Sequence, residues 1–476
     1  MKGDFTRVTF DPLKHYSRVL MQQGRVTLDA DPNEQTDILL HYVRTLAMDL
    51  IGPFAAPALG GGFQLSVDDH QQLVISAGRY YVDGILVEND APCLYSAQPD
   101  RPVGSDDLLI HEAAEQTGKT YWVYLDVWER HITCLDDGWI REKALGGPGT
   151  CTRSKVVWQV KAIEFDSGTD QEPNCAAPLA GLHAIGTGLM SARVDPGAQS
   201  DEPCVLSPQS KYRGAENHLY RVEVHQDGAG GAATFKWSRD NGSVVAAWLG
   251  TSGNDLEVSS GRGFTAGCWV ELTDDTRELL EQPGVLVYVT KVEGQTLTID
   301  PSTKPTEDAA AWTETLINPK VRRWDQMDRG DVVLNEGAVP LTESSGDQVN
   351  WIDLEDGIQV QFNAGGEYRA GDYWLIPARV ATGGIEWPTS DSEVIAVQPL
   401  GIKHHYAPLG FVRWSDQQLQ IRPPCRCVFF PQSDCARRQR AVAPPRVDTP
   451  APPGPKAEPT GTTRKPAARP RAKPIA

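Results

Sequence analysis

Short runs of β-branched and aromatic residues, separated by turn residues, recur from residue 56 to residue 435. In a typical case, Asp83 and Gly84 separate the apolar runs of residues 72–82 and 85–88. An Asp-Gly pair in this setting predicts a β-hairpin, because a two-residue type I′ turn needs positive φ at both positions. Amphipathic helical repeats are rare over the same region. The sequence therefore predicts a mainly β, multi-domain protein of sandwich or barrel units, and not a doubly wound sheet.

Composition divides the chain into six expected segments. Five prolines and many small polar residues between residues 166 and 208 indicate a long connection between two β domains. Repeated prolines without apolar periodicity predict a disordered tail after residue 435. The expected segments are an N-terminal arm with one amphipathic helix (1–55), a first β domain (56–165), a Pro-rich connection (166–208), a second β domain (209–300), a third β region (301–435) and a basic Pro-rich tail (436–476).

Three local patterns specify the second β domain. Residues 218–225 alternate apolar and polar side chains, which predicts a half-buried strand. Asn241 and Gly242 predict a hairpin between the strands on either side of them. Residues 268–299 contain three more short strands, typical of a small barrel or sandwich, with one helical turn expected near residues 275–281.

One helix is specified at both of its ends. Asp31 is a suitable N-cap, Pro32 then stands at the first helical position, and Glu34 completes a capping box. Such a cap is worth about 1 kcal/mol relative to alanine. A Gly-Pro pair at residues 52–53 is expected to end the helix.

Apolar side chains of this helix recur every three or four residues and so share one broad face. Two alternatives remain for that face: the simpler one is packing on the sheet of its own chain, and the other is contact with a neighbouring subunit. Upstream of the helix, residues 19–28 have the pattern of two short strands around a glycine turn. The candidate partner-binding face consists of Ile38, Leu39, Tyr42, Val43, Leu46 and Leu50.

The net charge of −18 hides a division between the body and the tail. Residues 436–476 contain ten Lys or Arg against two acidic residues, a net of +8, which leaves −26 for residues 1–435. An acidic body argues against nucleic acid as the main ligand. For the basic tail, solubility and spacing are favoured over docking to an acidic partner.

We expect no signal peptide after Met1, because the polar start lacks an apolar core segment. The longest uncharged stretch, residues 50–67, contains two prolines and four glycines, so no membrane-spanning helix is expected there. We therefore expect synthesis in the cytoplasm, with release in a larger particle as an alternative.

Nine cysteines, an odd number scattered along a long chain, do not predict a disulfide framework. Cys425, Cys427 and Cys435 are clustered, but a zinc site usually requires a C-x₂₋₄-C pair matched by a second pair. We predict no metal and no cofactor.

Motifs for catalysis are incomplete. His111 and Glu115 resemble part of a zincin helix, but Glu115 replaces the second histidine. The acidic residues of segment 353–357 precede a glycine, which is more typical of a turn than of a calcium loop. His404 and His405 are expected to point to opposite faces of a strand, which suits a structural role better than a shared metal. We therefore expect no enzymatic activity.

Tryptophans and acidic pairs keep a glycan-related alternative open. Pairs such as Asp136–Asp137 and Asp274–Asp275 are too common among 63 acidic residues to identify a glycosidase. Tryptophan faces can stack on sugars, yet tryptophans within apolar strands are expected to fill cores. The tryptophans in such strands are Trp122, Trp128, Trp158, Trp237, Trp269 and Trp374.

Longer motifs, such as YLDVWER at residues 124–130 and FKWSRDNGSVV at residues 235–245, carry a family resemblance. Further motifs are at residues 3–7, 10–18, 22–26, 28–34, 152–160, 217–222 and 371–379. Together they resemble a bacterial domain-of-unknown-function family whose genes lie in loci for phage-tail-like contractile injection systems. That family has no established activity, so the resemblance implies no catalytic residues. Separately, residues 77–87 resemble hairpins of non-enzymatic phage baseplate and tail-fibre attachment proteins.

The expected function is that of a non-enzymatic structural or adaptor component of a phage-tail-like contractile injection particle, associated with its baseplate or tail fibres. The expected partners are other subunits of the particle, with a second copy of this chain as an alternative. Two other hypotheses remain: a glycan-binding or glycan-cleaving protein displayed on the particle, and an effector that the particle carries.

Overall fold

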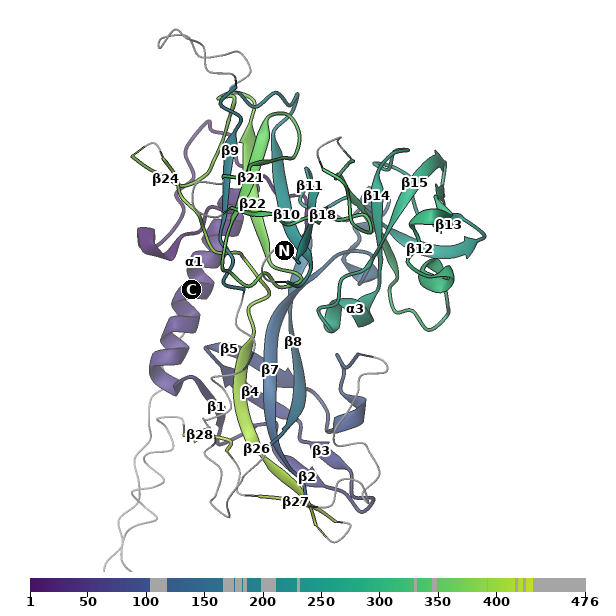
Figure 1. Ribbon diagram of the computed structural model, residues 1–476. Coiled ribbons are helices and arrows are strands. Elements are labelled where there is room, and N and C mark those ends of the chain that lie inside the picture. Colours follow the sequence, from purple (N-terminus) through teal and green to yellow (C-terminus); the bar gives the residue numbers. More distant parts are fainter. Residues whose placement is uncertain are drawn as a thin grey trace, which may run out of the picture. The chain divides into compact units, whose positions relative to one another are not determined.

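The computed structural model describes residues 1–102, 118–165, 175, 182, 186–197, 211–228, 232–328, 332–344, 349–391, 393–415, 418–422 and 425–430. The chain divides into two units, Met1–Phe429 and Phe430–Ala476. Only Phe430 is described in the second unit, so the predicted tail lies outside the described residues. Most of the predicted connection, residues 166–208, also lies outside them. The first unit is mainly β, as the sequence predicted (Figure 1).

Helix α1 (Ala30–Ile51) is the longest helix of the described residues, and its start differs from the prediction. Asp29, and not Asp31, occupies the N-cap position. The carboxylate of Asp29 makes no capping bond, because it accepts hydrogen bonds from the backbone N–H of Thr6 at 2.9 Å and from its hydroxyl at 2.5 Å. The predicted Asp31 cap is therefore wrong. Gly52, with φ of 91°, ends the helix as predicted.

The first group of strands builds three sheets. It consists of β1 (Phe54–Pro57), β2 (Leu65–Val67), β3 (Leu73–Ile75), β4 (Gly78–Val82), β5 (Ile85–Asn89), β6 (Cys93–Leu94), β7 (Thr120–Ile132), β8 (Arg153–Glu164), β26 (His405–Ser415), β27 (Gln418–Ile421) and β28 (Val428–Phe429). Their orders are β27-β26-β7-β8, β28-β1-β4-β5 and β2-β3-β6. One buried core, with Tyr80, Tyr121 and Trp158, joins all three sheets. Strands from residues 405–429 thus complete sheets that begin before residue 165.

The second group forms a closed barrel with the order β12-β13-β16-β15-β14-β17. Its elements are β12 (Val245–Ser252), β13 (Asp255–Val258), β14 (Trp269–Thr273), helix α3 (Asp275–Leu279), β15 (Val285–Glu293), β16 (Thr296–Ile299) and β17 (Lys320–Trp324). Leu256, Val270 and Val287 lie in its fully buried core. The predicted small barrel and its single helical turn are confirmed (Figure 1).

The third group contains two further sheets and one short hairpin. It consists of β9 (Met190–Val194), β10 (His218–Gln226), β11 (Thr234–Ser238), β18 (Val339–Pro340), β19 (Glu343–Ser344), β20 (Ile352–Asp353), β21 (Ile358–Asn363), β22 (Tyr373–Arg379), β23 (Gly384–Ile385), β24 (Thr389–Ser390) and β25 (Glu393–Val394). One sheet has the order β18-β11-β10-β22-β23. In the other, β21 pairs with β9, β19 and β20. β24 and β25 pair with each other.

Two predictions for this region are wrong. Strand β10 is buried on both faces and not half-buried, because Arg221, Glu223 and His225 are enclosed between neighbouring elements. Asn241 and Gly242 do form a turn with φ of 50° and 62°. However, the flanking strands β11 and β12 belong to different sheets, so this turn connects two sheets and closes no hairpin.

Short 3-10 helices and one disulfide complete the described structure. The 3-10 helices are η1 (Pro12–Lys14), η2 (Tyr95–Ala97), η3 (Gly138–Ile140), η4 (Lys143–Leu145), η6 (Pro301–Thr303) and η7 (Glu307–Ala310). Cys175 and Cys425 form a disulfide with Cα atoms 5.6 Å apart, which the scattered cysteines did not predict. With Cys425 in that bond, it is no longer available beside Cys427 as a thiolate ligand for zinc.

The Asp83–Gly84 hairpin supports α1. Strands β4 and β5 flank the turn as predicted, with φ of 46° at Asp83 and 78° at Gly84. A Cβ atom at Gly84 would overlap the backbone of Arg44 in α1. The hairpin turn and the helix therefore touch through their main chains.

We predict that Gly84→Ala lowers the free energy of unfolding by about 2–4 kcal/mol, because strain at positive φ adds to the overlap with α1. Gly253→Ala is the matched control: Gly253 has φ of 63° in the β12–β13 turn, and a Cβ there meets no atom within 4 Å. We expect the control to cost only about 1 kcal/mol. Urea unfolding measures both variants. Equal losses would show that α1 does not rest on this turn.

Candidate functional site

The first three residues are bound to the β body, although only Gly3 is fully buried. The α-amino group of Met1 donates to the hydroxyl of Tyr373 at 2.6 Å. The side-chain amide of Asn241 donates to the carbonyl oxygens of Met1 and Gly3, at 3.2 and 2.9 Å. Burial, followed by the nearby charge of Arg221, lowers the pKa of the Met1 amino group to about 4. The predicted N-terminal arm is thus anchored at its beginning, and in Figure 1 the N label lies near β10 and β18.

A buried charge network surrounds Lys2, and we call it the Lys236 network. The ammonium group of Lys2 lies 2.9 Å from Glu223, and that of Lys236 contacts both Glu223 and Glu271. Glu271 also accepts from the indole N–H of Trp324 at 2.9 Å. Lys236, Glu223 and Glu271 are each at most 3% exposed. Four strands, β10, β11, β14 and β17, therefore meet the N-terminal segment at this point.

Opposite charges set the ionisation of the carboxylates in the Lys236 network. Burial alone would raise the pKa of Glu223, but Lys2, Arg221 and Lys236 outweigh it and hold the pKa well below its usual value. The pKa of Glu271 is lowered in the same way, with Lys236 as the strongest opposing charge. Both groups are therefore carboxylates over the ordinary pH range, and their charges are compensated inside the protein.

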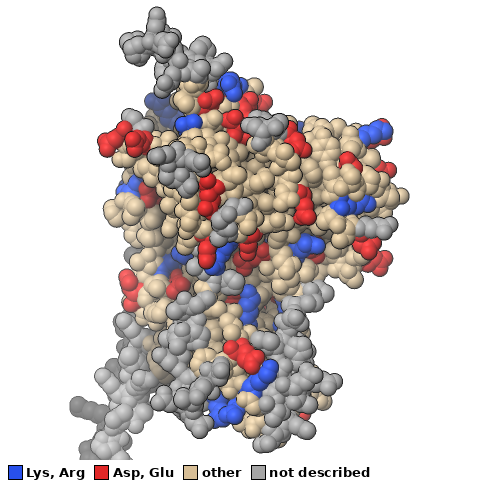
Figure 2. All heavy atoms as spheres, in the orientation of Figure 1, with Lys and Arg blue, Asp and Glu red and all other residues tan. Residues whose placement is uncertain are grey.

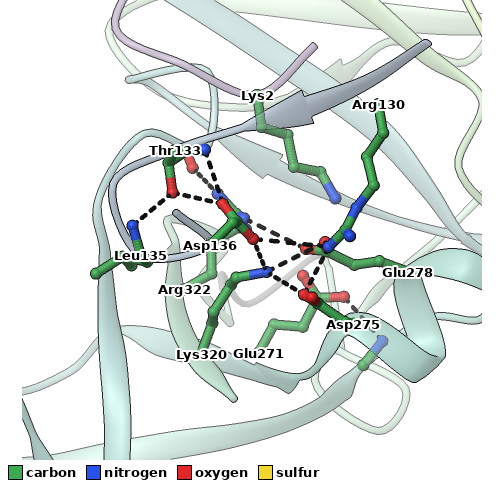
Figure 3. A network of polar contacts seen from close by, with 12 residues as sticks. Lys2, Arg130, Thr133, Leu135, Asp136, Glu271, Asp275, Glu278, Lys320 and Arg322 are labelled. Carbon is green, nitrogen blue, oxygen red and sulfur yellow. Dashed lines mark hydrogen bonds and ion pairs between the residues drawn. The ribbon is translucent and has the colours of Figure 1, made fainter. Parts of the chain in front are cut away.

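A second network links β7 to the barrel (Figure 3). The guanidinium group of Arg130 lies 2.6 Å from Asp275 and 2.5 Å from Glu278. The ammonium group of Lys320 lies 2.6 Å from Asp136 and 2.9 Å from Asp275. Arg130 comes from β7, Lys320 from β17, and Asp275 and Glu278 from α3. We call this group the Arg130 network.

The Arg130 network has the oxygen ligands of a metal site but not its electrostatics. Carboxylate oxygens of Asp136, Asp275 and Glu278 lie within 4.8 Å of one another, which would suit a hard cation such as Ca²⁺ or Mg²⁺. However, Arg130 and Lys320 already point between these oxygens, as Figure 3 shows. Two fixed cations neutralise the carboxylates that a metal would need. The cluster is therefore an ion-pair network.

The adjacent histidines have separate partners. Nδ1 of His404 lies 2.7 Å from Asp126, and its Nε2 lies 3.0 Å from Glu281. Nδ1 of His405 lies 2.7 Å from Asp83. Burial would lower the pKa of His404, but the two carboxylates raise it to about 9. The predicted structural role of this pair agrees with these contacts, because each ring lies against carboxylates of its own.

Other residues considered for chemistry have structural partners. Glu355 accepts from Tyr220 at 3.0 Å and pairs with Arg239 at 2.6 Å, beside a turn at Asp356 and Gly357. Asp274 accepts from the Arg277 N–H and caps α3. The zincin-like segment of His111 and Glu115 lies outside the described residues. The six strand tryptophans fill cores as predicted and are Trp122, Trp128, Trp158, Trp237, Trp269 and Trp374.

Residues 12–28 form an exposed segment, which we call the arm loop. Its two predicted strands are absent, although a turn is present at residues 23–24. Both of its ends are anchored: Thr9 donates to Glu34 at 2.6 Å on one side, and Leu28 donates to Asp31 at 2.9 Å on the other. The arm loop therefore projects from fixed ends, and its exposed large apolar side chains are Leu13, Tyr16, Leu20, Met21, Val26 and Leu28.

Helix α1 presents most of its predicted apolar face to solvent. Of the six residues proposed from sequence, Ile38 is 1% exposed and contacts the body, whereas the other five are between 53% and 71% exposed. Only Ala30 and Ile38 of the whole helix are buried. Packing on its own chain therefore covers little of the helix. We call the exposed residues the outer face of α1: Leu39, Tyr42, Val43, Leu46 and Leu50.

The sequence predicted the apolar face of the helix, but it did not predict the buried charge network that binds the N-terminal segment. Nothing local marks Glu223 or Lys236 as buried, because charged residues in an alternating pattern usually face solvent. The one available signal was the density of charge in strands that are otherwise apolar, such as residues 218–225. Such a pattern is equally compatible with a buried charge network and with a solvent-exposed face.

Comparison with known proteins gives a family without a known role. The family of unknown function DUF6519 matches residues 1–177 and 178–474, so the chain belongs to this family. Curated proteins and solved structures give no match. None of the helices in the described residues combines the length and apolar character needed to cross a membrane.

We predict that Glu271→Gln lowers the free energy of unfolding by about 3–5 kcal/mol, because it leaves the buried ammonium group of Lys236 undercompensated. Glu293→Gln is the control, since Glu293 pairs with Lys291 at 2.7 Å on the surface. That change should cost no more than about 1 kcal/mol. Chemical denaturation compares the two variants. Similar small losses in both would contradict a structural role for the Lys236 network.

We predict that His404→Gln costs more stability near neutral pH than at about pH 10. The folded pKa of about 9 lies above the ordinary 6.5, so the contribution of His404 to stability is complete below pH 6.5 and is lost as the pH rises through 9.

His225 provides a control of opposite sign, because burial lowers its pKa to about 4. Because the ring of His225 is buried in its neutral form, the wild type loses stability as the pH falls from 6.5 towards 4. The substitution His225→Gln should remove that loss of stability. Unfolding curves measured between about pH 4 and about pH 10 test both variants.

Proposed function

We propose that the protein is a non-enzymatic structural component of a phage-tail-like contractile injection particle. In this role, the arm loop and the outer face of α1 bind a neighbouring subunit. The observation that carries the proposal is that apolar surface: twelve large apolar side chains of residues 12–50, on the arm loop and α1, are exposed. Soluble monomers rarely expose contiguous apolar patches larger than a few hundred Å².

The weak attachment of α1 to its own chain supports a partner contact. Helices in water gain most of their stability from packing an apolar face. Helix α1 has 22 residues but buries only Ala30 and Ile38, while its outer face remains in solvent. A neighbouring subunit would supply the missing packing.

The charged groups support a scaffold role over a catalytic one. In the two networks, Lys236 and Lys320 are held by carboxylates at hydrogen-bonding distance, so they position elements and are not available as bases. Acidic and basic side chains are also interspersed on the face drawn in Figure 2, without a patch of one sign. This distribution favours a protein partner over nucleic acid.

The particle itself is proposed from the sequence motifs, which resemble a family encoded beside phage-tail-like injection systems. Glycan binding receives no support from the six strand tryptophans, because their rings are buried. The effector hypothesis rests on the basic tail, which lies outside the described residues.

We predict that replacing residues 12–27 by a Gly-Ser linker removes the protein from purified particles while its body stays folded. A linker of roughly eight residues reaches about 26 Å, enough to rejoin the anchored ends. The measurement is the amount of the chain in sedimented particles, with circular dichroism of the isolated variant as the folding check. Leu249→Asp is the control, because Leu249 is as exposed as the outer face but belongs to the barrel. A wild-type chain that never cosediments with particles would refute the proposal.

A further inference from the structure

The arm loop and α1 are complementary in charge as well as in apolar character. Residues 12–28 contain Lys14, Arg18 and Arg25 and no acidic residue. Residues 30–51 contain four acidic residues against one basic residue, Arg44. The loop thus has a net charge of +3 and the helix a net charge of −3, although Asp31 and Glu34 of the helix already accept hydrogen bonds from Leu28 and Thr9 of the same chain.

The loop does not cover the helix of its own chain. Leu20 and Met21 are 67% and 61% exposed, and Leu46 on the helix is 59% exposed. Between its anchored ends, the backbone of the loop touches α1 where the N–H of Val19 donates to the side chain of Gln35 at 2.9 Å. The exposed apolar side chains of the loop and the outer face of α1 thus both remain in solvent on one chain.

We propose that the outer face of α1 binds the arm loop of a second copy of this chain. The inference deepens the proposed function and rests on it in one respect, namely that this surface is a subunit contact. A second copy is the occupant that the charges favour, because each copy supplies both a basic apolar loop and an acidic apolar helix. Reciprocal exchange gives a dimer, and exchange in one direction gives a ring or chain.

The dimensions of the two segments agree with this contact. A loop of 17 residues that is anchored at both ends reaches roughly 28 Å, half of its extended length. Helix α1, with 22 residues, is roughly 33 Å long. The loop can therefore cover most of the outer face.

The apolar surface is large enough for a stable contact. Five exposed side chains on the helix and six on the loop offer about 100 Å² each. One loop on one helix would then bury on the order of 1,000 Å², and reciprocal exchange about 2,000 Å², which is the range of stable interfaces.

Sedimentation velocity of the purified full chain with two complementary variants tests the inference. The loop variant carries Leu20→Asp and Met21→Asp, and the face variant carries Val43→Asp and Leu46→Asp. The loop variant keeps an intact face, and the face variant keeps an intact loop. We expect wild type to associate, each variant alone to associate at least roughly tenfold more weakly, and an equimolar mixture to regain a heterodimer. Leu249→Asp should associate like wild type.

Recovery in the mixture excludes misfolding as the cause of the loss, since an unfolded variant could not restore the contact. We also expect weaker wild-type association at high salt, because opposite charges meet in the contact. A loop variant that associates like wild type would show helix-to-helix pairing, and a face variant that does so would show loop-to-loop pairing. Either result would overturn the inference, as would two variants that are monomeric alone and stay monomeric when mixed. So would wild type that remains monomeric at about 100 μM.

Particle sedimentation separates this inference from the proposed function. A monomeric wild-type chain that is still present in particles overturns the second-copy contact alone. A chain that associates through loop and helix but is absent from particles overturns the particle role alone.

Discussion

The compensation of buried charge in the Lys236 network is the constraint on which the rest of the described structure depends. An ammonium group that is almost fully enclosed needs carboxylates within hydrogen-bonding distance, since an unpaired buried charge costs several kcal/mol. Glu223 and Glu271 meet that need only if β10, β11 and β14 converge. Lys2 joins them, so the start of the chain is fixed inside the body.

Fixing the start of the chain has a consequence for the surface. Met1 and Lys2 are held by the body, and Thr6 and Thr9 are held by the start of α1, so the residues before Ala30 form a loop with two anchored ends. The arm loop and the outer face of α1 then remain as the largest uncompensated apolar surface near the N-terminus. The charged groups of the two networks are paired within the chain while these apolar groups stay exposed, which supports the proposed subunit contact.

Local signals predicted the elements whose geometry depends on neighbouring residues alone. Gly52 ends α1, and Asp83 and Gly84 form a hairpin turn, because the ease of adopting positive φ depends on the residue type itself. Predictions failed where distant residues decided the outcome. Asp29 replaced Asp31 at the helix start through a bond to Thr6, and the Asn241–Gly242 turn joins two sheets because β11 and β12 find different partners.

The sequence by itself determined that this is a mainly β chain with one helix whose apolar side chains share a face. Periodicity and turn chemistry suffice for that, because they act over a few residues. Only the tertiary structure decided which side of the helix is covered: Ile38 packs inward, whereas Leu39, Tyr42, Val43, Leu46 and Leu50 stay in solvent. An apolar stripe predicts that burial of the stripe is favourable, but it does not identify the element or subunit that covers it. That depends on long-range contacts of the helix, such as the contact of Arg44 with the turn at Gly84.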